Sequence, residues 1–207
     1  MKRLIAGLGI GLGVVMMLGC SGQSEMISLS IPSLRDPAAA KQAKGAGPTV
    51  GVVRFEDKRA NRSHLGTKTG RLGGIEHFGV RGNDPGQAAA TALADYLRSK
   101  GWNASVMSES AASSADVMVS GEIQEMEVDA KNGFFSTDLS SKVKVLVQGN
   151  NKNDGSKVRM TLTGSGTDSV FWFSPDDAQG LVNDVMAESF SKLVSSTKFE
   201  NGALRLN

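Results

Sequence analysis

The residues whose types suit catalysis lie at spacings that do not support it. Gly66-Thr67-Lys68-Thr69-Gly70 has the composition of a phosphate loop, but the Gly-x4-Gly-Lys-Ser/Thr spacing and a following helix are both missing. Gly164-Ser165-Gly166 lacks the Gly-x-Ser-x-Gly spacing of a serine nucleophile. Asp176-Asp177 stands where a helix is expected to begin, so capping explains this carboxylate pair. We therefore expect neither nucleotide binding nor an enzyme.

Two histidines offer a second kind of chemistry. His64 and His77 are the only ones in the chain, and Asp57 and Glu76 lie near them in sequence. Imidazole and carboxylate groups together suit transition metals. The separations are irregular, however, and no His-x-x-Glu-His or related helical spacing supports a zinc site. We expect solvated histidines in a loop, no metal and no cofactor.

The single cysteine has an explanation from its position. Lys2 and Arg3 precede an apolar run from Leu4 to Leu18 that is shorter than the about 20 residues needed to span a bilayer. A positive start and a short apolar run are typical of a secretory signal peptide. The run ends in Met17-Leu18-Gly19-Cys20, which resembles a bacterial lipobox. Residues 1–19 are then a lipoprotein signal peptide, and the alternative is an ordinary signal peptide with an incidental cysteine.

Lipidation at Cys20 would give stable attachment to a membrane. Diacylglycerol and an amide-linked chain such as palmitate together supply three acyl chains, more than the two signals that stable anchoring needs. The non-acidic Ser21 resembles the sorting signal for the outer membrane, and anchoring in the inner membrane is the alternative. We expect attachment at the periplasmic face.

The net charge argues against nucleic-acid binding. The whole chain of 207 residues has 23 Lys and Arg against 21 Asp and Glu, but Lys2 and Arg3 belong to the leader. The mature chain is therefore neutral and lacks the basic excess that binding to phosphates requires. One cysteine also excludes an internal disulfide framework.

The chain beyond the leader is expected to contain one folded domain. Residues 20–48 are rich in Ser, Gly, Ala and Pro and predict a flexible tether, interrupted by a short edge strand where Ile27, Leu29 and Ile31 alternate. Residues 49–198 predict the domain, and residues 199–207 a C-terminal tail.

Hydrophobic periodicity predicts an α+β domain. It is a two-layer mixed sheet of about five strands with two amphipathic helices on one face. The helices begin near Asp84-Pro85 and Ser174-Pro175, where capping residues precede a periodic apolar face. The strands cover Thr49–Glu56, Ala104–Met107, Asp116–Asp129, 142–148 and 158–162, with a hairpin loop at 150–156. In the strand expected at Asp116–Asp129, the apolar side chains change from odd-numbered to even-numbered positions, which predicts a bulge near Gln124–Glu125.

Several short motifs resemble the YajG-type family of bacterial lipoproteins. They are Val50-Gly51-Val52-Val53, Asp57-x-Arg59, Leu65-Gly66-Thr67, the helix ending Lys100-Gly101-Trp102, and Ala115-Asp116-Val117, and they extend over most of residues 49–196. The element order is also similar to the amino-terminal domain of TolB and to the curli secretion lipoprotein CsgG. The resemblance implies a fold and an envelope location, and it supplies no catalytic residues.

Residues 57–83 show no periodicity and are expected to form a mobile recognition loop. From Arg54 to Arg81 seven basic residues stand against three acids, whereas from Glu109 to Asp138 seven acids stand against one lysine. Opposed charges of this kind orient partners. The predicted contact residues are Arg59, Arg62, Lys68 and Arg71, with Leu65 and Phe78 as apolar anchors, and replacing the four basic residues should change stability little.

Two functions are left open. The first is a non-enzymatic interaction or assembly module that contacts the membrane through its lipid and binds an envelope protein. The second is a carrier of lipid or another amphiphile, auxiliary to envelope transport, in which Val170–Phe173 and Met186 would line an apolar groove.

Overall fold

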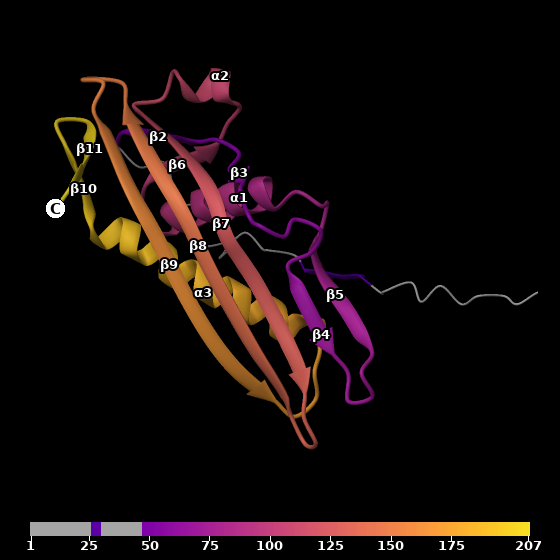
Figure 1. Cartoon of the computed structure of the whole chain (residues 1–207). Helices are drawn as coiled ribbons and strands as arrows, with labels where there is room; N and C mark the ends of the chain where they lie inside the picture. Colours follow the sequence, from indigo (N-terminus) through magenta and orange to yellow (C-terminus); the bar gives the residue numbers. More distant parts are fainter. Residues whose placement is uncertain (1–25, 30–46) are drawn as a thin grey trace, which may run out of the picture.

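The computed structural model describes residues 26–29 and 47–207 (Figure 1). Cys20, Ile31 and most of the expected tether lie outside these residues. The strands are β1 (Met26–Leu29), β2 (Thr49–Val52), β3 (Glu56–Asp57), β4 (Gly66–Thr69), β5 (Ile75–Val80), β6 (Asn103–Val106), β7 (Val117–Asn132), β8 (Thr137–Asn151), β9 (Lys157–Val170), β10 (Thr197–Glu200) and β11 (Ala203–Leu206). The helices are α1 (Pro85–Ser99), α2 (Glu109–Ala112) and α3 (Pro175–Ser195).

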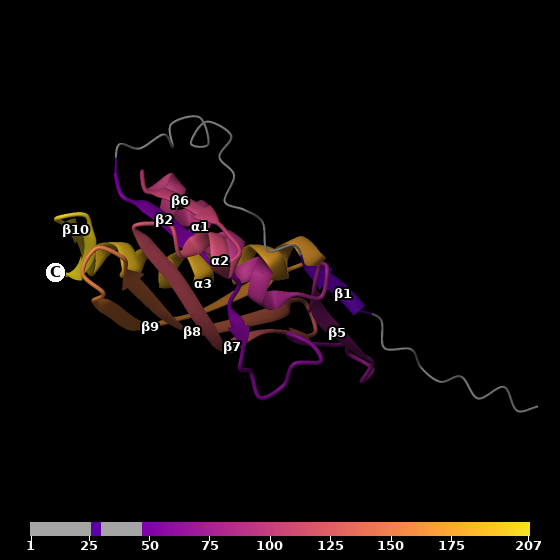
Figure 2. The same ribbon diagram turned by 90° about the horizontal axis from the view of Figure 1, so that it is seen from above.

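The long strand β7 holds the main sheet together. Along one edge it pairs in parallel with three short strands in turn, β2, β3 and β4, and along the other edge it pairs antiparallel with β8. β9 continues the antiparallel side, and β6, β5 and β1 extend the parallel side. Figures 1 and 2 show β7, β8 and β9 side by side, with β9 outermost.

The structure confirms the α+β class and the mixed sheet, but the expected number of strands is wrong. The main sheet has nine strands in the described part of the chain, and β10 and β11 form a separate pair. The difference arises mainly because residues 57–83 contribute strands where a loop was expected. The strand expected at Ile27 and Leu29 is present as β1, which pairs in parallel with β5 at the end of the strand order.

The bulge expected from the change of parity is present in β7. The register against β8 shifts between Ile123 and Glu125. Before the shift Val119 and Ile123 are buried, and after it Met126 and Val128 are buried. One extra residue therefore returns both halves of a 16-residue strand to the same core.

Both expected helices are present and begin at their expected caps. The Asp84 carboxylate accepts a hydrogen bond from the Gln87 backbone N–H at 2.9 Å, and Pro85 is the first residue of α1. At α3 the Asp177 carboxylate accepts from the Ser174 backbone N–H at 2.7 Å. α1 contacts β6 and β2, whereas α3 contacts β8 and β9. That both helices cover one face of a two-layer fold stays a prediction.

The expected C-terminal tail is instead a hairpin that packs on the sheet. Leu204 of β11 is buried. The side chain of Asn151, at the end of β8, accepts from the Leu204 N–H at 2.8 Å and donates to the Leu204 carbonyl at 2.9 Å. Asn201-Gly202, with positive φ at both residues, forms the turn between these two strands, and this Asn-Gly pair is the local signal that the prediction of a tail overlooked.

Two glycines let α3 lie close to β9. A Cβ on Gly164 would stand 2.4 Å from Ser189 Oγ and 2.7 Å from the Val185 carbonyl oxygen, and a Cβ on Gly166 would stand 2.9 Å from a Val185 methyl. Gly164-Ser165-Gly166 therefore serves helix packing. None of the helices in residues 26–29 and 47–207 is long and apolar enough to cross a membrane.

We predict that Gly164→Val destabilises the domain by about 1–3 kcal/mol, because the new side chain would clash with the α3 backbone at Val185, which is packed against β9. Ser165→Val is the matched control, since Ser165 is exposed on the opposite face of the same strand and β-branched residues suit strands. Urea unfolding of both variants measures the difference. Equal stability of the two variants would contradict the close approach of α3.

Candidate functional site

Residues 57–83 are not an irregular loop, so that expectation is wrong. β4 pairs in parallel with β7, where Lys68 stands opposite Ala130, and β5 folds back antiparallel on β4. These strands are four and six residues long. Segments so short show little periodicity, and the strand that orders β4 lies about 60 residues further along the chain.

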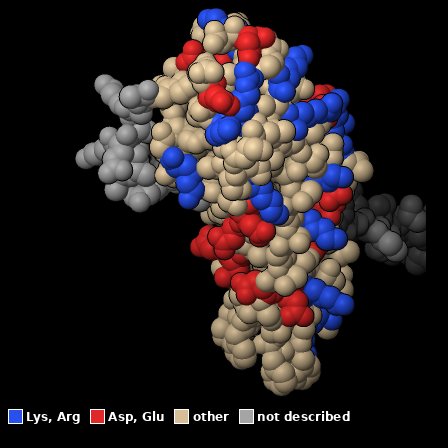
Figure 3. Space-filling model, turned by 90° about the vertical axis from the view of Figure 1, so that its left-hand side faces the viewer, with Lys and Arg blue, Asp and Glu red and all other residues tan. Residues whose placement is uncertain are grey.

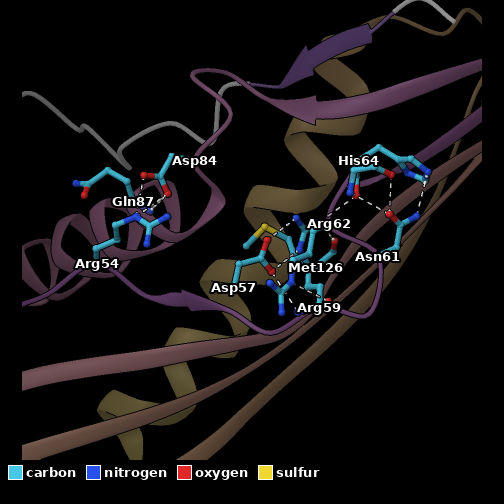
Figure 4. Close-up of polar contacts among 10 residues, drawn as sticks. Arg54, Asp57, Arg59, Asn61, Arg62, His64, Asp84, Gln87 and Met126 are labelled. Atoms are coloured by element: carbon cyan, nitrogen blue, oxygen red, sulfur yellow. Dashed lines mark hydrogen bonds and ion pairs between the residues drawn. The ribbon is translucent and has the colours of Figure 1, made fainter.

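Arg59 is the residue that fixes the start of this segment (Figure 4). Its Nε and Nη2 donate to the two carboxylate oxygens of Asp57 at 2.9 and 2.8 Å, which is a forked ion pair. Its Nη1 donates to the His64 carbonyl at 3.1 Å. The Arg59 side chain is only 5% exposed. Hydrogen bonds from Arg59 hold the pKa of Asp57 below its ordinary value, so the carboxylate stays charged beside the buried guanidinium.

The structure places three of the six predicted contact residues in the interior. Arg59, Leu65 and Phe78 are all buried. The backbone of Leu65 bridges two strands, donating to the Phe78 carbonyl at 2.6 Å and accepting from the Val128 N–H at 3.0 Å. Their burial and backbone contacts order the segment, and contact of these three side chains with a partner stays a prediction.

The other three predicted contact residues are more accessible. Arg62 is exposed, and its Nε donates to the Arg59 carbonyl at 3.3 Å. Lys68 is half-buried and forms an ion pair with Glu76 at 2.5 Å. Arg71 is exposed, and its guanidinium lies over the ring of Phe134 at 4.5 Å from the ring centroid. Their binding of a partner stays a prediction.

The opposed charges seen in the sequence are partly cancelled in the fold. In the register of β7 and β8, Glu127 stands opposite Lys142 and Glu125 opposite Lys144. These lysines follow residue 138, so the acidic stretch of the sequence omits them. Cross-strand neighbours of opposite charge weaken the negative field of β7.

The two histidines stack on each other. Their ring centroids are 4.4 Å apart, and the Nδ1 atoms of His64 and His77 are both buried without a hydrogen-bond partner. The side chain of Asn61 lies 3.0 Å from Nε2 of His64. Within residues 26–29 and 47–207, no three His, Cys, Asp or Glu side chains group as metal ligands. His64 lies in the loop before β4, as expected, whereas His77 lies in β5, and both residues are half-buried instead of fully solvated.

Four exposed aromatic residues gather at one end of the sheet. We call them the aromatic tip: Phe134 and Phe135 in the β7–β8 turn, and Phe171 and Trp172 between β9 and α3. The exposed fractions of these residues are 71, 72, 67 and 83%. Figure 3 shows this lower end of the molecule largely free of charged side chains, below a band of acidic residues. Exposed apolar patches of this kind mark interaction sites.

The rings of the aromatic tip are arranged around a hollow. Phe134 meets Phe135 edge to face at 4.6 Å, and Phe171 meets Trp172 edge to face at 5.3 Å. The hollow, of about 390 Å³, is also lined by Phe173, Lys68 and Arg71. The apolar groove that was expected from Val170–Phe173 and Met186 does not form as such, because Met186 is buried in the core. The hollow lies instead among the rings of the aromatic tip. The apolar run Val170–Phe173 predicted one half of this site from the sequence. The other half, Phe134 and Phe135, lies in a turn for which the sequence showed no pattern.

A larger hollow lies beside the tip. It measures about 950 Å³ and is lined by the ends of β4, β7, β8 and β9. Asp129, Asp138 and Asp168 are its acidic residues, and Thr67 donates to the Asp129 carboxylate from its backbone N–H at 2.8 Å. These carboxylates mark the boundary between the apolar end and the polar body.

The comparisons with known proteins identify a fold and no family. No protein-family profile and no curated protein matches the sequence. A DUF330 family protein from Xanthomonas campestris has a similar structure with a TM-score of 0.50 and 10% identity, covering 82% of this chain and 91% of that protein. At such identity the similarity shows a shared fold alone.

Two further structures are less similar. The PelC dodecamer from Paraburkholderia phytofirmans has a TM-score of 0.41 and 19% identity over 70% of this chain and 90% of its own. Lipoprotein GNA1162 from Neisseria meningitidis has a TM-score of 0.37 and 11% identity over 72% and 99%. Both scores are too low for a shared fold to follow. Membership of the YajG-type family stays a prediction.

We predict that Arg59→Ser destabilises the domain by about 3 kcal/mol, because it leaves the Asp57 carboxylate and the His64 carbonyl without their buried donor. The double variant Arg62→Ser, Arg71→Ser should change stability by less than about 1 kcal/mol, since exposed charges contribute little. Chemical denaturation compares the two proteins. If the double variant were the less stable one, the role assigned to Arg59 would be wrong.

Proposed function

We propose that this chain is an envelope lipoprotein, anchored through acylated Cys20, whose folded domain acts as a non-enzymatic interaction module. The leader and the lipobox in the sequence support the anchor, with the periplasmic face of the outer membrane as the location. The assembly role rests on one observation, which is the uncovered edge of the main sheet.

That edge is β9, a strand of 14 residues that pairs only with β8 in the described part of the chain. Between Met160 and Thr167 it has neither a charged residue nor a proline. Proteins usually protect a long edge strand with charges, proline or a covering element, because its backbone groups accept a further strand. Thr161, Thr163 and Ser165 are exposed beside this edge.

The chemistry of the edge fits a partner protein that supplies an extended segment. Main-chain hydrogen bonds then give affinity, and a row of hydroxyl side chains tolerates varied neighbours. Lys192 of α3 donates to the Thr163 carbonyl at 2.6 Å and so occupies one backbone acceptor of β9. The remaining length supports addition of a strand.

The anchor is tested by metabolic labelling with radioactive palmitate. We predict that the wild-type chain incorporates the label and that Cys20→Ser does not, because the thiol is the acceptor of the diacylglycerol. Ser21→Ala is the control, since it leaves the cysteine in place. Labelling that persists in Cys20→Ser would exclude lipidation at this residue.

The edge is tested by photocrosslinking in the envelope. We predict that benzoylphenylalanine at Ser165 forms adducts with an extended segment of a partner, and that the same group at Gln87 does not, because Gln87 is exposed on α1 and not on β9. Mass spectrometry identifies the crosslinked peptide. Adducts at Gln87 with none at Ser165 would place the interaction elsewhere.

A second function, carriage of a lipid or other amphiphile, is favoured by the hollow of about 390 Å³ among the rings of the aromatic tip. Native mass spectrometry separates the two functions. Co-purified lipid supports the carrier, whereas an empty domain that crosslinks through β9 supports the interaction module.

A further inference from the structure

We propose that the aromatic tip is a second membrane contact, which enters the interfacial layer of the bilayer that holds the acyl chains of Cys20. This inference rests on the proposed lipid anchor and adds an orientation to it. The domain would then stand on the membrane by one end of its sheet.

The side chains of the tip have the chemistry of a membrane interface. Trp172 and three phenylalanines are each at least two-thirds exposed, and Leu72, in the neighbouring β4–β5 turn, is fully exposed. Of the exposed large apolar side chains in the described residues, Ile75 is the first residue of β5, next to the β4–β5 turn, Leu206 lies in β11, and the others lie in these turns. Tryptophan favours the boundary between headgroups and acyl chains, and phenylalanine and leucine insert beside it.

The charges around the tip fit the same surface. Arg71 lies over Phe134, and the Lys68 ammonium lies 4.9 Å from the centroid of Phe173. Residues 70–75, 132–137 and 171–174 include no carboxylate. A long basic side chain can keep its charge at phosphate level while its stem lies along apolar groups.

The acidic residues behind the tip limit how far it can enter. Asp138 follows Phe135 by three residues, and Asp168 precedes Phe171 by three. Both line the larger hollow beside the tip, and Figure 3 shows an acidic band above the apolar end. Since a charged carboxylate is expensive to bring into hydrocarbon, the contact is shallow.

The start of the described chain brings the anchor to this end of the molecule. β1 runs parallel to β5, with Met26 opposite His77, and β5 runs away from the β4–β5 turn. Met26 is therefore the end of β1 that is nearer to the tip. Met26 follows Cys20 by six positions, and a chain of this length can span at most about 21 Å. His77 follows Leu72 by five residues, about 17 Å of extended strand, so the anchor can reach the plane of the tip.

Depth-dependent quenching tests the contact in the full lipidated protein. The chain is reconstituted in phosphatidylcholine vesicles whose acyl chains are brominated near the headgroup. Trp102→Phe leaves Trp172 as the single tryptophan, and Trp172→Phe leaves Trp102 as the internal control. Trp102 packs against Phe199 at 4.7 Å, beyond the far end of α3, whose 21 residues extend about 31 Å.

We expect Trp172 to lose about half of its emission relative to non-brominated vesicles, because an interfacial ring lies at the acyl-chain boundary. Trp102 should lose almost none. Adding Phe134→Ser and Phe135→Ser should reduce the quenching of Trp172 by at least about twofold, since less apolar surface remains to insert. Leu206→Ser, at the other exposed apolar site, should leave it unchanged.

Three results would overturn the proposal, and they separate its failure from that of the anchor. Vesicle flotation with equal, weak quenching of both tryptophans would leave the anchor intact and exclude contact by the tip. A blue shift of Trp172 that depends on protein concentration, without quenching, would assign the tip to a second copy of the chain. Failure of the protein to float with the vesicles would exclude the anchor and the membrane contact together.

Discussion

The backbone of β7 is the constraint on which the rest of the structure depends. β2, β3 and β4 are between two and four residues long, and strands of this length have little stability of their own. Each of them pairs with a different part of β7, in parallel and in chain order. The bulge at Ile123 keeps both halves of β7 directed at one core, so a single strand of 16 residues provides a template for the whole parallel side.

Because β3 and β4 both pair in parallel with β7, the chain between them must make a turn before β4 begins. The hydrogen bonds of Arg59 hold this connecting segment in place. A buried guanidinium is tolerated because the Asp57 fork and the His64 carbonyl satisfy its donors. The same pair holds the chain between β3 and β4 against β7, where Arg59 Nη1 also lies 3.5 Å from the Met126 carbonyl. The ordering of residues 57–83 therefore depends on an ion pair at its start as well as on the strand pairing of β4 and β5 that follows.

The sequence predicted the long elements and missed those defined by distant partners. α1, α3 and the bulge of β7 each leave a local pattern of caps or parity. β4 and β5 leave none, because β4 pairs with a part of β7 about 60 positions away and β5 is ordered by its pairing with β4 and β1. Arg59 was assigned to the surface by its charge, and burial of a paired arginine depends on tertiary contacts. Phe134 and Phe135 belong to a turn, where an apolar pair is equally compatible with burial and exposure.

The two proposed surfaces are the edge of β9 and the aromatic tip. Both belong to the long strands of the main sheet, and the length of these strands keeps them apart. β9 has 14 residues, about 48 Å of antiparallel strand, with the aromatic tip beyond one end and the β10–β11 hairpin near the other. With the tip at a bilayer, the edge of β9 extends away from the membrane over that length. Strand addition uses the backbone of this edge, whereas insertion uses side chains of the turns beyond it. Neither contact covers the other, so an anchored domain can hold a partner at its edge while its tip stays in the membrane.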